Sequence, residues 1–152
     1  MNAFSRLLTH RLATQADCAL LGEWNHQLIR DEGHSNPMTA RELEQRMSGW
    51  LQEGYLAVIF EEAGQPVAYA LYFETADRVH LRHCFVARGH RRGGIGRRVL
   101  EILRGHVWPG SKRLTVDVLA ANTGGVAFWR SVGYRDYSLT LEITPSGPAT
   151  LT

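Results

Sequence analysis

The eight residues from Arg91 to Arg98, RRGGIGRR, combine three glycines with four arginines. Glycine allows the backbone to bend sharply and to approach a ligand closely, and arginine forms charge-assisted hydrogen bonds with anions. The surrounding sequence predicts a strand that ends near Val86 and a helix that begins near Gly94. Unpaired N–H groups and the helix dipole favour an anion at such a helix start. We therefore predict a phosphate-binding loop, with a solvated turn before a surface helix as the alternative.

Two known phosphate-binding motifs fit this loop poorly. A Walker loop requires Lys-Ser or Lys-Thr after the glycines, and neither follows here. A dinucleotide fingerprint matches at Gly94 and Gly96, and Asp117 stands near its acidic position, but Val99 occupies the place of its third glycine. The antiparallel meander expected before the loop also argues against that fold, which begins with parallel β-α-β crossovers.

The segments around the loop predict a regular succession of strands and helices. Strands are expected at 5–13, 55–60, 66–74, 79–86, 113–119 and 137–143, and helices at 17–33, 39–51, 94–104 and 122–133. The second helix begins with a capping box, Thr39-Ala40-Arg41-Glu42, and the first and last begin with the expected N-caps Asp17 and Asn122. Gly133 is the expected end of the last helix. The element order is β-α-α-β-β-β-α-β-α-β.

The composition is that of one ordinary domain. The chain has 152 residues, of which 44% are hydrophobic, and its net charge of +2 makes no general case for binding nucleic acid or membranes. Two cysteines are too few for a disulfide framework or a zinc site with paired cysteines. We expect a single domain at residues 1–144, a frayed tail at 145–152 and a cytoplasmic protein without a membrane-spanning segment.

Two segments resemble the GNAT superfamily of acyl-CoA-dependent N-acetyltransferases. In FVARGHRRGGIGRRVLEIL, a strand-ending Val is followed by Arg or Gln, two residues, Gly, one residue, and Gly or Ala, as in the signature of that family. NTGGVAFWRSVGY is similar to the family element Asn-x-x-Ala-x-x-Phe-Tyr-x-x-x-Gly-Phe. The matching residues are Val86, Arg91, Gly94, Gly96, Asn122, Phe128, Gly133 and Tyr134. The resemblance implies a mixed α/β fold with a central, mostly antiparallel sheet of about six to seven strands and about four flanking helices.

The resemblance also implies acetyl-CoA as the cofactor. The loop would bind its pyrophosphate, and its pantetheine arm would lie along splayed strands like an added strand. The expected cofactor-binding residues are Phe85, Val86, Arg91, Arg92, Gly93, Gly94, Ile95, Gly96, Arg97, Asn122, Phe128 and Trp129. A backbone N–H near Phe85 or Val86 would stabilise charge on the thioester oxygen. Gly125 replaces the alanine of the family, which close passage of the cofactor would explain, and no metal is expected.

Transfer of an acetyl group to an amine requires movement of protons. Primary amines are mostly protonated at pH 7, so a base is needed, and His80 is the candidate, with a purely structural role as the alternative. Strand alternation predicts that His83 faces the other way. Members of the family usually supply a tyrosine as acid where this chain has Trp129, whose N–H is no acid at neutral pH. We predict that Tyr134 replaces it, with Tyr137 or water as alternatives.

The acceptor is the least defined part of the prediction. In the resemblance, the first two helices and their linker shape the acceptor pocket, and the candidates here are Asp31, Glu32, Tyr69 and Tyr72; the two acids favour a cationic amine. We expect an N-acetyltransferase that acts on a primary amine of a small molecule or peptide by direct attack in a ternary complex. The alternatives are a CoA-binding member of the family without catalysis and a nucleic-acid-binding module that uses Arg82 to Arg98, although only Phe85 could stack on bases there. A monomer and a homodimer both stay open.

Overall fold

The computed structural model describes residues 7–145. Within this range the sheet has five strands, β1 (Leu8–Leu12), β2 (Leu56–Glu62), β3 (Gln65–Glu74), β4 (Arg78–Val86) and β5 (Arg113–Val116). The α-helices of the same range are α1 (Cys18–Asp31), α2 (Ala40–Gln52), α3 (Ile95–Ile102) and α4 (Thr123–Ser131). Short 3-10 helices at Gln15–Asp17 and Arg88–His90 precede α1 and follow β4, and a π-helical turn at Leu103–Val107 extends α3.

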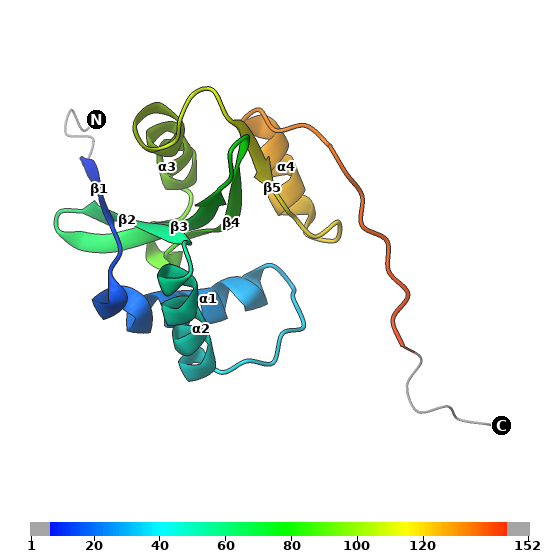
Figure 1. Cartoon of the computed structure of the whole chain (residues 1–152), viewed down its shortest axis with the longest axis horizontal. Coiled ribbons are helices and arrows are strands. Elements are labelled where there is room, and N and C mark those ends of the chain that lie inside the picture. Colours follow the sequence, from blue (N-terminus) through cyan, green and yellow to red (C-terminus); the bar gives the residue numbers. More distant parts are fainter. Residues whose placement is uncertain (1–6, 146–152) are drawn as a thin grey trace.

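The strands lie side by side in the order β1-β2-β3-β4-β5 (Figure 1). Neighbouring strands are antiparallel except β4 and β5, which are parallel and are joined through α3. This arrangement confirms the predicted mixed α/β class and the mostly antiparallel sheet. The described residues contain five strands, slightly fewer than the expected six to seven. β1 and β5 form the two edges of the sheet.

The prediction of a final strand at residues 137–143 is wrong. The segment is extended, but no backbone hydrogen bond joins it to any other described residue. In Figure 1 it leaves the end of α4 and runs away from the sheet. Its alternation of apolar and polar residues correctly indicated an extended chain. A strand also needs an edge to pair with, and residues 137–143 do not reach one in this structure.

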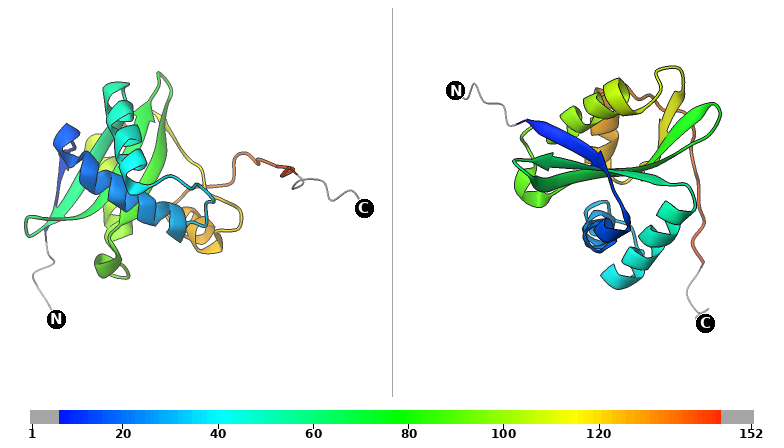
Figure 2. Two further views of the ribbon diagram at one scale, coloured as in Figure 1. Left: turned by 90° about the horizontal axis from the view of Figure 1, so that it is seen from below. Right: turned by 60° about the vertical axis from the view of Figure 1, so that its left-hand side comes forward.

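Helices cover both faces of the sheet, as Figure 2 shows. α1 and α2 pack on one face, over side chains such as Ile59 and Tyr69. α3 and α4 lie on the other face, over side chains such as Val58 and Tyr72. Because successive side chains of a strand point to opposite faces, β2 and β3 contribute alternately to the two cores. We call these the α1/α2 face and the α3/α4 face.

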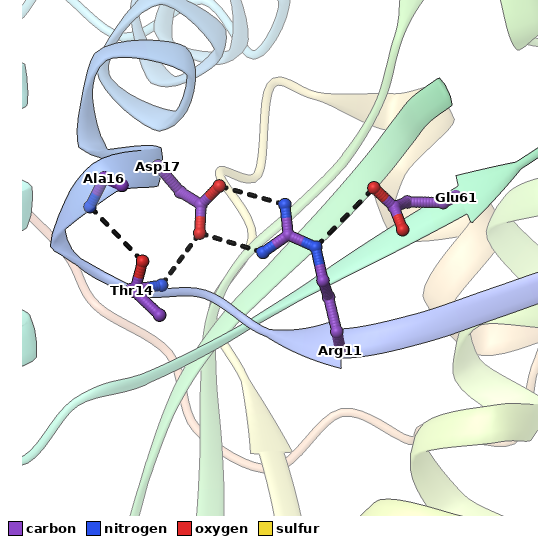
Figure 3. A network of polar contacts seen from close by, with 5 residues as sticks. All are labelled: Arg11, Thr14, Ala16, Asp17 and Glu61. Carbon is purple, nitrogen blue, oxygen red and sulfur yellow. Dashed lines mark hydrogen bonds and ion pairs between the residues drawn. The ribbon is translucent and has the colours of Figure 1, made fainter. Parts of the chain in front are cut away.

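A polar network fixes the chain between β1 and α1 (Figure 3). Arg11 donates two hydrogen bonds to the Asp17 carboxylate, at 2.9 and 3.0 Å, and forms an ion pair of 3.5 Å with Glu61 of β2. Asp17 also accepts a hydrogen bond of 2.8 Å from the backbone N–H of Thr14. Asp17 therefore stands at the predicted N-cap position of α1, but its side chain serves the preceding 3-10 turn instead of capping α1.

The predicted caps at Thr39 and Asn122 and the glycine after the last helix are confirmed. The hydroxyl of Thr39 accepts a hydrogen bond of 3.1 Å from the N–H of Glu42, whose carboxylate accepts one of 2.9 Å from the N–H of Thr39. The side-chain oxygen of Asn122 accepts from the N–H of Gly125 at 3.0 Å. After α4, Gly133 has a φ of 109°, a conformation that favours glycine at helix ends.

A bulge in β4 changes which of its side chains share a face. Leu71 of β3 pairs with His83, whereas Tyr72 pairs with Leu81, so that Arg82 is an extra residue in β4. Such a bulge bends the strand and interrupts the alternation of its side chains. The residues on either side of Arg82 therefore do not obey the simple rule of opposite faces.

Two predictions at the chain ends fall partly outside the described residues. Of the predicted tail at 145–152, only Pro145 is described, and residues 5 and 6 of the predicted first strand also lie outside. Within residues 7–145, none of the helices combines the length and the apolar character that crossing a lipid bilayer requires.

Candidate active site

The loop between β4 and α3 has the backbone of an anion-binding turn. Arg92 and Gly94 have φ angles of 69° and 78°, in the left-handed region, and flank Gly93. Residues of alternating handedness turn successive N–H groups to the same side, which creates a concave site for an anion. The left-handed conformation is unusual for an arginine, so the fold holds this loop in a costly shape.

The N-terminus of α3 has no side-chain cap. Gly94 occupies the N-cap position, and among the described residues no side chain accepts a hydrogen bond from the first turn of α3, which also contains no acid. α2 and α4, in contrast, have their caps from Thr39 and Asn122. Ile95, only 6% exposed, anchors the first turn in the core. The free N–H groups and the helix dipole make this helix start suitable for a phosphate.

Arg91 is used within the protein to hold the loop. It donates a hydrogen bond of 2.8 Å to the carbonyl of Val86 and one of 2.7 Å to the carboxylate of Asp31, at the end of α1. Arg88 donates to the same carboxylate at 3.0 Å. Burial alone would raise the pKa of Asp31, but the bonds from Arg91 and Arg88 lower it, so the carboxylate is ionised. The charge of Arg91 is therefore already matched, as is that of Asp31.

α3 and α4 meet directly behind the loop. A Cβ added to Gly96 would lie 3.5 Å from the ring of Phe128 and 3.9 Å from Val86, so these three predicted residues come together. Arg97 donates a hydrogen bond of 3.2 Å to the hydroxyl of Ser131 at the end of α4. Of the predicted arginines, Arg92 is exposed, and its side chain has no partner within the described part of the chain.

β4 and β5 separate on the way to the loop. They pair only from Arg78 to Leu81 of β4, and β4 then continues to Val86 while β5 ends at Val116. Beyond Leu81, no described strand pairs with β4 on that side. The main-chain groups of this free edge, which includes Phe85 and Val86, can therefore bind an extended ligand that ends at the loop.

His80 lies where β4 and β5 are still paired, and both of its ring nitrogens have partners. Nδ1 is 2.8 Å from the hydroxyl of Thr115, and Nε2 is 3.4 Å from the carboxylate of Asp117. Burial lowers the pKa of His80, and the charge of Asp117 offsets this only in part, so the ring is neutral at pH 7. Because a carboxylate only accepts hydrogen bonds, Nε2 carries the proton, and the lone pair that a general base needs lies on Nδ1, facing the Thr115 hydroxyl.

A row of aromatic rings places His80 and His83 on the same face. His83 contacts Trp50 of α2, with 5.7 Å between ring centroids, and Trp50 contacts Tyr55 at 5.3 Å. Tyr55 contacts Phe73 at 5.4 Å, and Phe73 contacts His80 at 5.3 Å. The prediction that the two histidines face opposite ways is therefore wrong, and the bulge at Arg82 is the reason.

Trp129 and Tyr134 lie together at the end of α4. Their ring centroids are 5.4 Å apart, and Trp129 packs from a half-buried position on the α3/α4 face. The hydroxyl of Tyr134 is buried and has no hydrogen-bond partner within residues 7–145. Burial, with a smaller contribution from Cys84, raises the pKa of Tyr134 to about 12. The phenol is therefore protonated at neutral pH and has a hydrogen bond to donate.

Of the predicted acceptor residues, Glu32 has the most unusual carboxyl group. Burial and the neighbouring charge of Asp31 raise the pKa of Glu32 to about 7. The carboxylate is 3.5 Å from the ring of His34 in the linker between α1 and α2. Burial raises the pKa values of Tyr69 and Cys84, and the charge of Glu32 is the second cause. Glu32 therefore lies close to β3 and β4.

Tyr69 and Tyr72 are buried on opposite faces of β3. Tyr69 belongs to the α1/α2 face, and its hydroxyl bonds to Nδ1 of His83 at 3.0 Å. Burial lowers the pKa of His83 to about 3, so this pair is uncharged. Tyr72 lies against Trp108 on the α3/α4 face, 2% exposed. The structure brings Tyr69 near Glu32 but does not bring Tyr72 to them.

The sequence from residue 24 to residue 143 matches the family model described as an acetyltransferase (GNAT) domain. The chain belongs to the GNAT acetyltransferase family. This confirms the family that the loop and the α4 segment resemble, since both lie within the matched range.

Solved structures share the fold of this GNAT acetyltransferase. A possible acetyltransferase from Clostridium difficile 630 is 15% identical, with a TM-score of 0.76 over 92% of this chain and 98% of that one. A predicted acetyltransferase from Clostridium acetobutylicum, solved with acetyl-CoA, is 17% identical, with a TM-score of 0.69 over 91% and 96% of the two chains. The aminoglycoside N-acetyltransferase AAC(6')-Iy, solved with CoA, is 13% identical, with a TM-score of 0.71 over 95% and 99%.

The GNAT resemblance did not draw attention to two arginines on the α1/α2 face. The guanidinium carbons of Arg46 and Arg82 lie 4.3 and 4.5 Å from the centroid of Trp50, and no carboxylate pairs with either within residues 7–145. The Nε of Arg46 is buried without a hydrogen-bond partner there. Helical spacing of Arg46 and Trp50 was a signal for their contact. The contact of Arg82 with Trp50 depends on the bulge in β4, which no local sequence pattern indicated.

Gly125 has a structural reason in this GNAT domain. A Cβ at this position would lie 2.5 Å from the side-chain nitrogen of Asn122, closer than real contacts allow. The Asn122 side chain folds over Gly125 because it caps α4 through the Gly125 N–H. The space that this cap requires explains the glycine, so close passage of a cofactor is not needed as a reason. The side chain of Asn122 caps α4.

Proposed function

We propose that this protein transfers the acetyl group of acetyl-CoA to a primary amine of a small molecule or peptide, by direct attack of the amine in a ternary complex. The observation that carries the proposal is the uncapped N-terminus of α3, which follows a loop with two left-handed residues and adjoins the free edge of β4. Membership of the GNAT family and structural neighbours solved with acetyl-CoA and CoA support it.

The residues of the loop and of β4 fit coenzyme A. The N–H groups from Gly93 to Gly96 would hold the pyrophosphate, with added charge from Arg92. Arg91 would act by holding the loop, since its own bonds go to Val86 and Asp31. The free edge of β4 would bind the pantetheine arm as an added strand, which brings the N–H groups near Phe85 toward the thioester oxygen.

The reaction joins the amine nitrogen to the acyl carbon and breaks the bond from that carbon to sulfur. A protonated primary amine loses one proton before it attacks and a second as the amide forms, whereas the leaving sulfur gains one, so one proton is released to solvent overall. His80 is the proposed acceptor of the amine proton, with Thr115 and Asp117 holding its ring. Tyr134 is the proposed donor to the sulfur, because its hydroxyl is protonated and uncommitted within the described residues.

Glu32 is the proposed contact for the amine of the acceptor. Asp31 was the second acidic candidate, but its carboxylate already binds Arg88 and Arg91. Glu32 has no arginine or lysine partner within residues 7–145, where the ring of His34, at 3.5 Å, is its one ionisable neighbour in contact. A cationic amine near Glu32 would replace part of the solvation that the carboxylate loses by burial.

An acetylation assay with a panel of amines tests the proposal. Purified protein, acetyl-CoA and a polyamine, an aminoglycoside, an amino acid or a short peptide are combined, and both free thiol and the mass of the acetylated amine are measured. We expect release of thiol that depends on protein and on one class of amine, with a matching N-acetylated product. Binding of acetyl-CoA without a product from any class would favour a CoA-binding member of the family without catalysis.

A further inference from the structure

Arg46 of α2 is a half-buried cation without an anion. Its guanidinium carbon lies 4.3 Å from the centroid of the Trp50 ring, and no carboxylate pairs with it within residues 7–145. Its Nε is buried there without a hydrogen-bond partner. Burial, followed by the charge of Arg82, lowers the pKa of Arg46. Contact with an aromatic face offsets only part of the cost of burying a charge, so folding alone does not explain Arg46.

Arg82 of β4 brings a second positive charge to the same ring. Its guanidinium carbon is 4.5 Å from the centroid of Trp50, and it donates a hydrogen bond of 3.4 Å to the uncharged hydroxyl of Tyr55. No carboxylate pairs with Arg82 within the described part of the chain, whereas Arg91 is matched by Asp31. Two like charges against one ring repel each other, and an anion bound by both would relieve that repulsion.

The buried pair of Tyr69 and His83 connects these arginines with the proposed acceptor contact at Glu32. Burial lowers the pKa of His83 to about 3, and the charges of Arg82 and Arg46 are the next causes. Burial raises the pKa of Tyr69, the charge of Glu32 adds to the rise, and that of Arg46 acts against it. One uncharged pair therefore lies within electrostatic reach of the acid and of both arginines, all on the α1/α2 face.

We propose that Arg46 and Arg82 bind a carboxylate of the acceptor, which is therefore a small amino carboxylic acid. This inference rests on the proposed function, because it names the class of amine that the same site acetylates. A carboxylate offers two oxygens and fits the planar donor fork of arginine. Glu32 would contact the amine at the other end of the molecule, and His80 stands only two positions before Arg82 in β4. Amines without an anionic group, such as polyamines and aminoglycosides, would leave both arginines unmatched.

Binding measurements test the carboxylate site without requiring turnover. Common amino acids are screened by thermal unfolding of the full-length protein, with and without CoA, and the tightest binder and its amide are then titrated calorimetrically. Wild type should bind the amino acid about 10- to 100-fold more tightly than the amide, which lacks the charge that the arginines bind. Binding of no amino acid, equal affinities for acid and amide, or tighter binding of phosphoethanolamine overturns the proposal.

Variants of the two arginines show whether they create the preference for the acid. Arg46→Gln and Arg82→Gln should each lose most of it, through weaker binding of the amino acid and little change in binding of the amide. Arg41→Gln, at an exposed position of α2, removes the same charge elsewhere and should keep the preference. Far-UV circular dichroism checks that each variant is folded. A preference that survives in both Arg46→Gln and Arg82→Gln would mean that the arginines only cover Trp50, and it overturns the proposal.

Turnover separates the carboxylate site from the proposed function. An amino acid that binds with the expected preference but gives no N-acetylated product in the presence of acetyl-CoA would support the carboxylate site and contradict acetyl transfer. Acetylation of a polyamine or an aminoglycoside, with no binding of any amino carboxylic acid, would support acetyl transfer and overturn the carboxylate site.

Discussion

The two ends of the sheet differ in how completely the chain itself finishes them. At the β1 to β3 end, α1 and α2 bury their apolar faces, and hydrogen-bonded side chains close the turns. At the β4 to β5 end, β4 has a free edge, α3 has no side-chain cap and α4 has no buried residue within the described part of the chain. The first end is therefore a scaffold that folding alone stabilises, and the second leaves the main-chain groups unpaired that the proposed cofactor site would use.

The largest expected effect compares a tryptophan from each end. Trp24 of α1 is 8% exposed and contacts Tyr69 and Phe85, with ring centroids 6.0 and 5.5 Å apart. Trp24→Ala should lower the free energy of unfolding by about 3–5 kcal/mol, because it opens a cavity in a packed core. Trp129→Ala should cost about 1–2 kcal/mol, since Trp129 is only half-buried. Chemical denaturation measures both, and equal losses would erase the contrast between the two ends.

A pair of glycines tests how tightly α1 and α2 are packed. A Cβ on Gly22 of α1 would lie 2.7 Å from backbone atoms of Glu44 in α2, whereas Gly49 of α2 has open space around it. Gly22→Ala should therefore destabilise the protein by about 2 kcal/mol, because the two helices must move apart. Gly49→Ala should stabilise it by about 0.5–1 kcal/mol through helix propensity. Thermal unfolding in which Gly22→Ala is as stable as wild type would mean that this contact is loose.

The raised pKa of Glu32 predicts a specific dependence of stability on pH. The folded protein keeps a proton on Glu32 up to about pH 7, whereas the unfolded chain releases it near 4.5. The contribution of Glu32 to the free energy of unfolding is therefore lost as pH rises between these values. With 32% of the side chain exposed to screening solvent, the loss should be about 1–2 kcal/mol.

Glu32→Gln should remove this pH dependence. The variant and wild type should have similar stability at pH 4, and the variant should be the more stable protein at pH 8. Glu23→Gln, at an exposed position of α1, controls for the loss of one negative charge. Denaturation curves across this pH range decide the matter, and parallel profiles for Glu32→Gln and wild type would show that Glu32 is well solvated.

The smallest expected change in stability comes with a loss of activity. The hydroxyl of Tyr134 is buried without a partner among the described residues, which costs stability. Tyr134→Phe should raise the free energy of unfolding by about 1 kcal/mol and lower kcat without a comparable change in KM for acetyl-CoA. An increase in stability with an unchanged kcat would show that the phenol of Tyr134 does not donate a proton in the reaction.

Features that depend on neighbouring residues were the ones that the sequence predicted. The capping box of Thr39 and Glu42, the Asn122 cap and the limits of β3 all rest on local patterns. The loop at Gly93 to Gly96 was predicted in the same way, because its glycines, arginines and helix start are adjacent. Such signals act within one element and do not require knowledge of what packs against it.

Three features that depend on distant residues were not predicted from the sequence. The bulge at Arg82 arises from pairing with β3 and reverses the expected face of His83. Asp31 meets Arg91 from 60 residues away, and this contact removes Asp31 from the predicted acceptor contacts. The segment after Tyr134 has the alternation of a strand, but whether it pairs depends on which edge it can reach.

The most direct test of the cofactor site compares two glycines with the same φ angle. Gly94 at the start of α3 and Gly64 in the β2–β3 turn both have a φ of 78°, so valine strains the backbone at either position. Isothermal titration with acetyl-CoA should show at least tenfold weaker binding for Gly94→Val and unchanged binding for Gly64→Val. Equal affinities for wild type and both variants would contradict the assignment of the loop to the pyrophosphate.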